Sequence, residues 1–226
     1  MTHMFPLNNH SPRMDEGRIP VVRCATEADL PEIVEIHRKA FSHFFLTRLG
    51  RGFLSRYYQF VLKYETGIVL VCEGVHELDG FVCGFVDPAD FYRAMWRGKR
   101  AFVLPAVSAL LRRPTLAAGV LNGVHRIHES ASRAPARSCE LSSIAVAPAA
   151  SGSHLGSALI RAFLAQAWSM DAECIYLTTD ADGNDWANAF YLRSGFEHTR
   201  RVLQRKGRWM NEYMIRREAA ENGVLP

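Results

Sequence analysis

A strand, a loop of small residues and a helix follow one another between residues 141 and 170. Residues 141–146 (LSSIAV) alternate between apolar and polar side chains, which predicts a β-strand. A helix is predicted to start near Ser153, and four apolar side chains share one of its faces: Leu155, Leu159, Phe163 and Met170. This strand–loop–helix order constrains the fold most, because it favours an α/β arrangement with helices packed on a sheet.

The loop between this strand and helix has the properties of an anion site. Its sequence, APAASGSH at residues 147–154, is dominated by small side chains that allow a ligand to approach the backbone closely. The first N–H groups of a helix have no partner within the helix, and the helix dipole places partial positive charge there. The loop therefore predicts a main-chain site for a phosphate or pyrophosphate. The alternative is an ordinary strand–turn–helix corner whose small residues serve packing.

The loop resembles the acyl-CoA loop of the GNAT acetyltransferase superfamily, V-x-P-x-x-(R/Q)-x-x-G-x-(G/A) followed by leucine. The matching residues are Val146, Pro148, Gly156 and Leu159. Two positions depart from the pattern, since Ser151 replaces the usual Arg or Gln and His154 replaces the usual Gly. His154 would need a backbone conformation that glycine adopts more easily. These departures bear on the affinity for coenzyme A more than on the fold.

A second stretch, residues 184–196, resembles the later GNAT signature N-x-x-A-x-x-F-Y-x-x-x-G-F, and it follows a predicted strand at 174–179. The two signatures occur in the family's order, and together the resemblance covers about the last ninety residues. It implies an α/β (α+β) GNAT fold, which is a mixed, twisted sheet with helices on both faces. A helical insertion is expected between the third and fourth strands.

The resemblance also assigns roles to individual residues. Tyr191 is expected to protonate the leaving thiolate, and Glu140 is the leading candidate for the general base, with Asp180 and Asp182 in reserve. The alternatives are an aromatic ring packed between helix and sheet for Tyr191 and a charge at a strand edge for Glu140. The residues expected to bind the cofactor are Ile144, Val146, Ser151, Gly152, Ser153, His154, Leu155, Gly156, Ser157 and Asn184.

The N-terminal half is consistent with the same fold. A strand at 21–25 leads to Thr26, which is predicted to cap a helix with Asp29 in the capping-box position. A second helix contains Phe53 to Val61, and residues 67–73 and 78–86 are predicted to form a hairpin in which Gly80 and Gly84 indicate a bulge or a close contact. In the family, the first two helices help to wall the acceptor site.

Three segments complete the organisation: a disordered leader at 1–20, one acetyltransferase domain at 21–217 and a C-terminal tail at 218–226. The helical insertion at 88–135 is far longer than an ordinary connection. An apolar run flanked by Arg and Lys could form an interfacial helix at a membrane or a lipid-linked substrate. We favour a lid packed on the sheet or on a second subunit, because the segment is short and contains Pro105.

Composition excludes some classes of protein. The formal net charge is +4 and the pI is near 8.9, which is too weakly basic to indicate a nucleic-acid-binding protein. No histidine joins cysteines or acids at metal-ligand spacing, so no metal is expected. The five cysteines lie in or beside strand-like runs, which indicates buried, reduced thiols in a cytoplasmic protein. No apolar run is long enough for a membrane span, although peripheral contact is left open.

Together these features predict an N-acetyltransferase that moves the acetyl group of acetyl-CoA directly to a primary amine. Resemblance to members associated with bacterial surface-polysaccharide synthesis suggests an amino sugar, either nucleotide-linked or lipid-linked. The alternatives are an acetyltransferase acting on protein amines or polyamines and a non-catalytic acyl-CoA-binding module, which the replacements at Ser151 and His154 would favour. The apolar insertion would also allow a homodimer.

Overall fold

The computed structural model describes residues 20–42, 44–74, 77–112, 137–150, 154–204 and 207–218. The predicted leader up to residue 19, the predicted tail from residue 219, and residues 113–136 of the insertion lie outside the described residues. The strands are β1 (Val22–Cys24), β2 (Gly67–Glu73), β3 (Leu78–Val86), β4 (Ser138–Val146), β5 (Cys174–Asp180), β6 (Glu197–Gln204) and β7 (Arg208–Arg216). The α-helices are α1 (Leu30–Ala40), α2 (Phe45–Arg48), α3 (Arg51–Lys63), α4 (Pro88–Arg97), α5 (Arg100–Arg112), α7 (Leu155–Ser169) and α8 (Asp185–Arg193).

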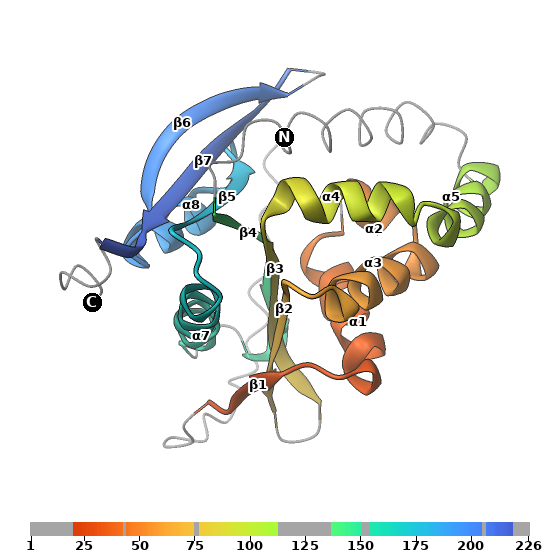
Figure 1. The fold of residues 1–226 in the computed structure, drawn as a ribbon, viewed down its shortest axis with the longest axis horizontal. Helices are drawn as coiled ribbons and strands as arrows, with labels where there is room; N and C mark the ends of the chain where they lie inside the picture. Colours follow the sequence, from red (N-terminus) through yellow and green to blue (C-terminus); the bar gives the residue numbers. More distant parts are fainter. Residues whose placement is uncertain are drawn as a thin grey trace.

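The strands form one mixed sheet in the order β1-β2-β3-β4-β5-β7-β6. Neighbouring strands are antiparallel except for β4 and β5, which are parallel and connected through α7. Helices α1 to α5 lie on one side of the sheet, and α7 and α8 lie on the other (Figure 1). The predicted mixed sheet with helices on both faces is confirmed.

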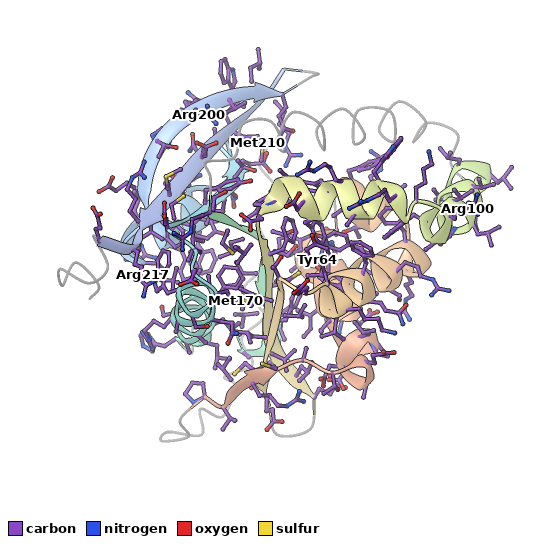
Figure 2. All side chains as sticks on the ribbon, viewed as in Figure 1. Tyr64, Arg100, Met170, Arg200, Met210 and Arg217 are labelled. Carbon is purple, nitrogen blue, oxygen red and sulfur yellow. The ribbon has the colours of Figure 1, made fainter. Side chains whose placement is uncertain are left out.

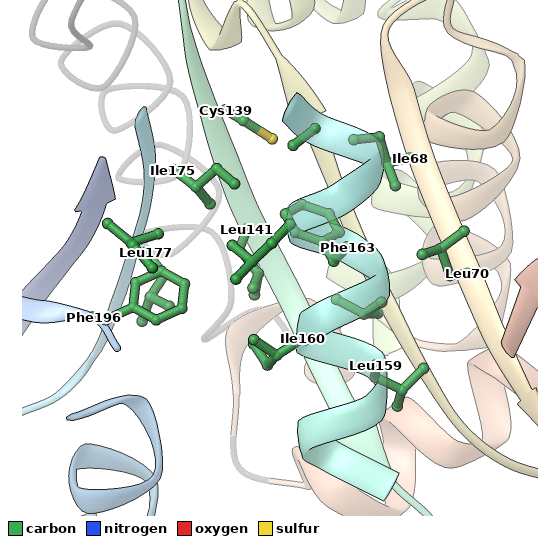
Figure 3. Packing of buried hydrophobic residues seen from close by; sticks show 14 of the residues in the cluster. Ile68, Leu70, Cys139, Leu141, Leu159, Ile160, Phe163, Ile175, Leu177 and Phe196 are labelled. Carbon is green, nitrogen blue, oxygen red and sulfur yellow. The ribbon is translucent and has the colours of Figure 1, made fainter. Parts of the chain in front are cut away.

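Two hydrophobic cores lie on the two faces of the sheet. On one face, α7 places Leu159, Ile160 and Phe163 against residues of β2, β4 and β5, as Figure 3 shows. On the other face, α1 and α3 pack on β2 and β3 around fully buried side chains, which include Ile33, Leu54, Tyr58 and Phe81. β2 and β3 contribute to both cores, because successive side chains of a strand point to opposite faces.

The predicted cap at Thr26 is confirmed, and it starts a 3₁₀ turn at Glu27–Asp29 that leads directly into α1. The Thr26 N–H donates to the Asp29 carboxylate at 2.7 Å, and the Asp29 N–H donates to the Thr26 carbonyl at 3.1 Å. Asp29 also receives two hydrogen bonds from the Arg23 guanidinium, at 2.8 and 2.9 Å. These bonds hold the pKa of the Asp29 carboxyl well below its usual value, with the Arg23 side chain as the largest cause.

The close contact predicted for the β3 glycines is found at Gly84. A Cβ atom at this position would lie 2.2 Å from the Glu140 carbonyl oxygen and 2.4 Å from Cζ of Phe163. The pairing register between β3 and β4 shifts beside it, so that Ser142 is the extra residue of a β-bulge. The glycine thus lets α7 and β4 approach β3.

The insertion begins as predicted, with two helices directly after β3. α5 continues through Pro105, and its Phe102 ring packs against Phe53 of α3 at 5.5 Å between ring centroids. Pro105 therefore does not break the helix. Four of the cysteines are buried as expected, whereas Cys24 is exposed.

Candidate active site

The two parallel strands at the centre of the sheet separate after a short stretch of pairing. β4 and β5 pair from Ser138 with Cys174 to Glu140 with Tyr176, yet β4 continues to Val146 and β5 to Asp180. β4 keeps its pairing with β3 as far as Val146. Among the described residues, no strand pairs with the other edge of β4 beyond Glu140.

Main-chain groups of Ile144 and Val146 face this unpaired edge. The Ala147 N–H donates to the Asp79 carbonyl on β3 at 2.7 Å, and Ala145 pairs with Phe81. Because peptide groups alternate in direction along a strand, the N–H and C=O of the alternate residues, Ile144 and Val146, point away from β3. An extended ligand could therefore bind here as an added strand, which is the role that the sequence predicts for Ile144 and Val146.

The start of α7 presents further unpaired N–H groups. The first intrahelical bond runs from Ala158 N–H to the His154 carbonyl at 3.1 Å, so the N–H groups of Leu155, Gly156 and Ser157 have no partner within the helix. The first turn carries no acidic side chain. These groups fit an anion such as a pyrophosphate. The predicted contacts of Ser151, Gly152 and Ser153 lie outside the described residues.

His154 adopts the backbone conformation expected from its place in the loop. Its φ is 58° and its ψ is 4°, which is the left-handed region that glycine occupies without steric cost. A residue with a Cβ atom is disfavoured there by about 1–2 kcal/mol. The side chain itself is exposed. The loop therefore keeps the backbone shape of a glycine without the open approach that glycine would give.

Gly156 brings α7 close to α8. A Cβ atom at Gly156 would lie 3.2 Å from the Phe190 ring, so a larger residue would push this ring away. Phe190 in turn stacks on Trp186 with 5.7 Å between ring centroids. The small residue of the first GNAT-like signature therefore packs against an aromatic residue of the second.

Tyr191 lies on α8 with its ring largely buried. It contacts the rings of Phe190, Phe196 and Tyr213. Burial raises the pKa of the Tyr191 hydroxyl, which keeps it protonated at neutral pH, as a proton donor must be. Its packing also matches the alternative expected from the sequence, an aromatic ring held between helix and sheet.

Glu140 is the last residue of β4 that pairs with β5, immediately before these two strands separate. Its neighbours Cys139 and Leu141 belong to the core beneath α7, so its side chain points to the opposite face of the sheet. The carboxylate accepts a hydrogen bond from the Tyr92 hydroxyl at 2.8 Å and one from the Tyr176 hydroxyl at 3.0 Å. Two neutral donors therefore fix a half-buried carboxylate where β4 and β5 diverge.

The tyrosines around Glu140 were not identified as site residues from the sequence. Tyr92 comes from α4 of the insertion and Tyr176 from β5, 48 and 36 residues from Glu140 along the chain. Burial is the largest cause that raises the pKa of both hydroxyls, so both remain donors. Beside them, the Tyr57 hydroxyl of α3 lies 2.5 Å from the Ser142 hydroxyl at the β4 bulge. Sequence spacing carries no signal for these contacts.

The other predicted polar residues have structural partners. Asp180 pairs with the guanidinium of Arg208, and Asp182 pairs with Arg201 at 3.1 Å. The Asn184 side-chain amide donates to the Thr179 hydroxyl at 2.7 Å, which connects the start of α8 to the end of β5. The two reserve candidates for the base are thus engaged with cations.

The mixed sheet, with β4 and β5 parallel and joined through α7, is the fold of an acyltransferase family. Residues 30–196 match the model of the acetyltransferase (GNAT) family, which is well over half of the chain. The protein belongs to the GNAT family and is an acetyltransferase that uses acetyl-CoA. No curated protein sequence matches the chain at a significant level.

Solved structures of acetyltransferases share this fold at low sequence identity. An N-acetyltransferase from Staphylococcus aureus Mu50 is 14% identical, with a TM-score of 0.58 over 88% of this chain and 99% of that chain. A ribosomal-protein-alanine N-acetyltransferase from Brucella melitensis is 17% identical, with a TM-score of 0.57 over 87% and 99%. The yncA protein of Salmonella typhimurium, solved with its cofactor acetyl-CoA, is 16% identical, with a TM-score of 0.56 over 88% and 94%.

Within the part of the chain that the structure describes, no helix is long and apolar enough to cross a membrane. The same residues contain no group of three or more His, Cys, Asp or Glu side chains placed to hold a metal ion.

Proposed function

We propose that the protein transfers the acetyl group directly to a primary amine, with Glu140 as the general base. The observation that carries this proposal is the position of the Glu140 carboxylate at the divergence of β4 and β5, fixed by two tyrosine hydroxyls. A carboxylate that two tyrosine hydroxyls hold in a fixed position is suited to accept a proton.

The donor and the acceptor would reach the reacting carbonyl from opposite faces of the sheet. Ile144 and Val146 would bind the pantetheine arm through their peptide groups, and the N–H groups of Leu155, Gly156 and Ser157 would bind the pyrophosphate. Ser151, Gly152, Ser153, His154 and Asn184 remain predicted contacts. The amine would approach on the face of α3 and α4, where the side chain of Glu140 points.

The chemical step moves one proton from nitrogen to sulfur. The amine nitrogen forms a C–N bond with the thioester carbonyl carbon as the C–S bond breaks. Glu140 accepts the proton that the nitrogen loses, directly or through water, and Tyr191 donates its hydroxyl proton to the leaving thiolate. The proton then returns from Glu140 to Tyr191 through solvent, so both residues end in their starting states.

For the acceptor, we propose an amino sugar. Its support is the resemblance to members associated with surface-polysaccharide synthesis, together with the hydroxyl-rich acceptor face formed by Tyr57, Tyr92, Tyr176 and Ser142. Protein N-termini and polyamines are the competing acceptors. We also propose that 21–217 form one domain with its insertion at 88–135.

A thiol-release assay with acetyl-CoA tests this function. The acceptor panel contains free and nucleotide-linked glucosamine, a peptide with N-terminal alanine, and spermidine. Turnover is expected with at least one amino sugar. Turnover confined to the peptide or to spermidine would overturn the acceptor assignment, and binding of acetyl-CoA without turnover on any amine would favour the non-catalytic module.

Two substitutions test the residue roles. Glu140→Gln and Tyr191→Phe are each expected to lower kcat by about 10²-fold, with acetyl-CoA affinity unchanged in calorimetry. Glu65→Gln and Tyr64→Phe, in the turn that follows α3, are the matched controls and should keep wild-type rates. A wild-type kcat in Glu140→Gln or in Tyr191→Phe would remove that residue from the mechanism.

A further inference from the structure

The helix α5 exposes an apolar surface that none of the described helices and strands covers. Leu104 and Leu111 are 79% and 80% exposed, and Val103 and Val107 are 49% and 45% exposed. At 100° per residue these four side chains fall within one arc of the helix, which we call the α5 apolar face. They include the two most exposed large hydrophobic residues of the described chain.

The opposite side of α5 anchors the helix to the body of the protein. Phe102 is 8% exposed and packs on the rings of Phe53 and Phe60, with centroids 5.5 and 6.0 Å away. Ala109 is also buried and clusters with Leu49. The helix lies at one end of the molecule (Figure 1), and Figure 2 shows Arg100 at the far end from Arg217. The α5 apolar face therefore projects from a fixed helix at the periphery.

Positive charge lies beside the start of this face. The segment from Pro88 to Arg112 contains five basic residues and one acidic residue, Asp90, so its formal net charge of +4 equals that of the whole chain. The Asp90 carboxylate is already paired with Arg93. The exposed basic side chains next to α5 are Arg97, Lys99 and Arg100. The Lys99 ammonium lies 4.6 Å from the centroid of the half-exposed Trp96 ring.

This combination fits an anionic lipid surface better than a second copy of the chain. A helix with an apolar face, basic flanks and a nearby tryptophan is the pattern of elements that lie in the plane of a bilayer interface. In a twofold contact between copies, the same patch would meet itself. A second copy would bring the exposed Arg97, Lys99 and Arg100 of the same patch to the contact, which adds like charges where an anionic surface would offer opposite ones.

We propose that α5 docks the protein on anionic membranes, with the α5 apolar face inserted among the acyl chains and the basic residues at the phosphate groups. Binding should weaken as salt rises, because exposed charges are screened. The continuous helix through Pro105 provides the rigid surface that such docking needs. This inference concerns where the enzyme acts and does not depend on which amine it acetylates.

Flotation of the full-length protein with vesicles tests the proposal. Vesicles of phosphatidylcholine with about a third phosphatidylglycerol should carry the protein upward, and vesicles of pure phosphatidylcholine should carry much less. Leu104→Glu should lower the partition coefficient about tenfold, and adding Leu111→Glu should lower it about a further tenfold. Leu203→Glu is the matched control, because Leu203 is 55% exposed but lies on β6, and it should change partitioning less than about twofold.

Two further measurements make each outcome informative. Near-ultraviolet circular dichroism and the thermal shift with acetyl-CoA should be unchanged in the α5 variants, which separates loss of docking from loss of fold or of donor binding. The proposal is overturned if the wild-type protein fails to float with anionic vesicles at low salt, or if Leu104→Glu floats like the wild type. It is equally overturned if sedimentation equilibrium shows a dimer that the double variant dissociates, since the α5 apolar face would then bind a second copy.

Discussion

His37 of α1 should make the stability of the protein depend on pH in a specific range. The residue is 3% exposed, and its Nδ1 lies 2.6 Å from the Tyr58 hydroxyl. Its Nε2 is buried and has no hydrogen-bond partner among the described residues. Burial lowers the pKa of the imidazole from 6.5 to about 4. The folded protein therefore holds a neutral histidine where the unfolded chain would already be protonated.

The size of the effect follows from these two pKa values. Between pH 6.5 and about 4 the unfolded state binds more protons than the folded state, so the free energy of unfolding falls as pH falls. At pH 5 the protonation of His37 in the unfolded chain lowers the free energy of unfolding by about 2 kcal/mol relative to neutral pH. This value follows from about 1.4 kcal/mol for each pH unit below the unfolded pKa. That is a large part of the stability of a typical domain.

Urea unfolding at about pH 7.5 and about pH 5 measures this linkage. His37→Gln keeps a polar side chain of similar reach but cannot titrate, so its loss of stability between the two pH values should be about 2 kcal/mol smaller than that of the wild type. His198→Gln, on exposed β6, is the control and should behave like the wild type. Equal losses in His37→Gln and in the wild type would refute the buried neutral imidazole.

Two further changes test packing and capping. Gly84→Ala should destabilise the fold by about 3 kcal/mol in thermal unfolding, because the new Cβ atom would lie 2.2 Å from the Glu140 carbonyl oxygen. Gly52→Ala in α3 is the control, because its Cβ atom would lie 4.0 Å from the nearest atom, Cβ of Pro105, and it should be neutral or slightly stabilising. Asp29→Asn should cost about 1–2 kcal/mol at neutral pH. This difference from the wild type should shrink as pH falls below about 4, because the unfolded carboxyl then takes up a proton while the folded carboxyl beside Arg23 stays ionised. Equal stabilities at neutral pH would contradict the role of the Arg23 pair.

Much of the fold could be predicted because its determinants are local. The bonds between Thr26 and Asp29 depend on two residues three positions apart, and the alternation of β4 is visible within nine residues. The left-handed conformation of His154 could likewise be expected from a motif in which glycine is usual. In each case the physical cause lies within one turn or one strand of the residue concerned.

The surroundings of Glu140 could not be predicted, because they depend on residues that are distant in the sequence. Glu140 itself could be selected, since it precedes the motif on the same strand. Its two hydrogen-bond donors come from α4 and β5, and their approach depends on how the insertion packs on the sheet and where β4 and β5 stop pairing. The insertion thus contributes to both ends of the proposed function: Tyr92 of α4 fixes the base, and α5 carries the surface that we propose for membrane docking. On these proposals, a substitution at Tyr92 of α4 would change the rate of acetyl transfer, and a substitution on the α5 apolar face would change membrane binding. Substituting one helix at a time separates the two effects.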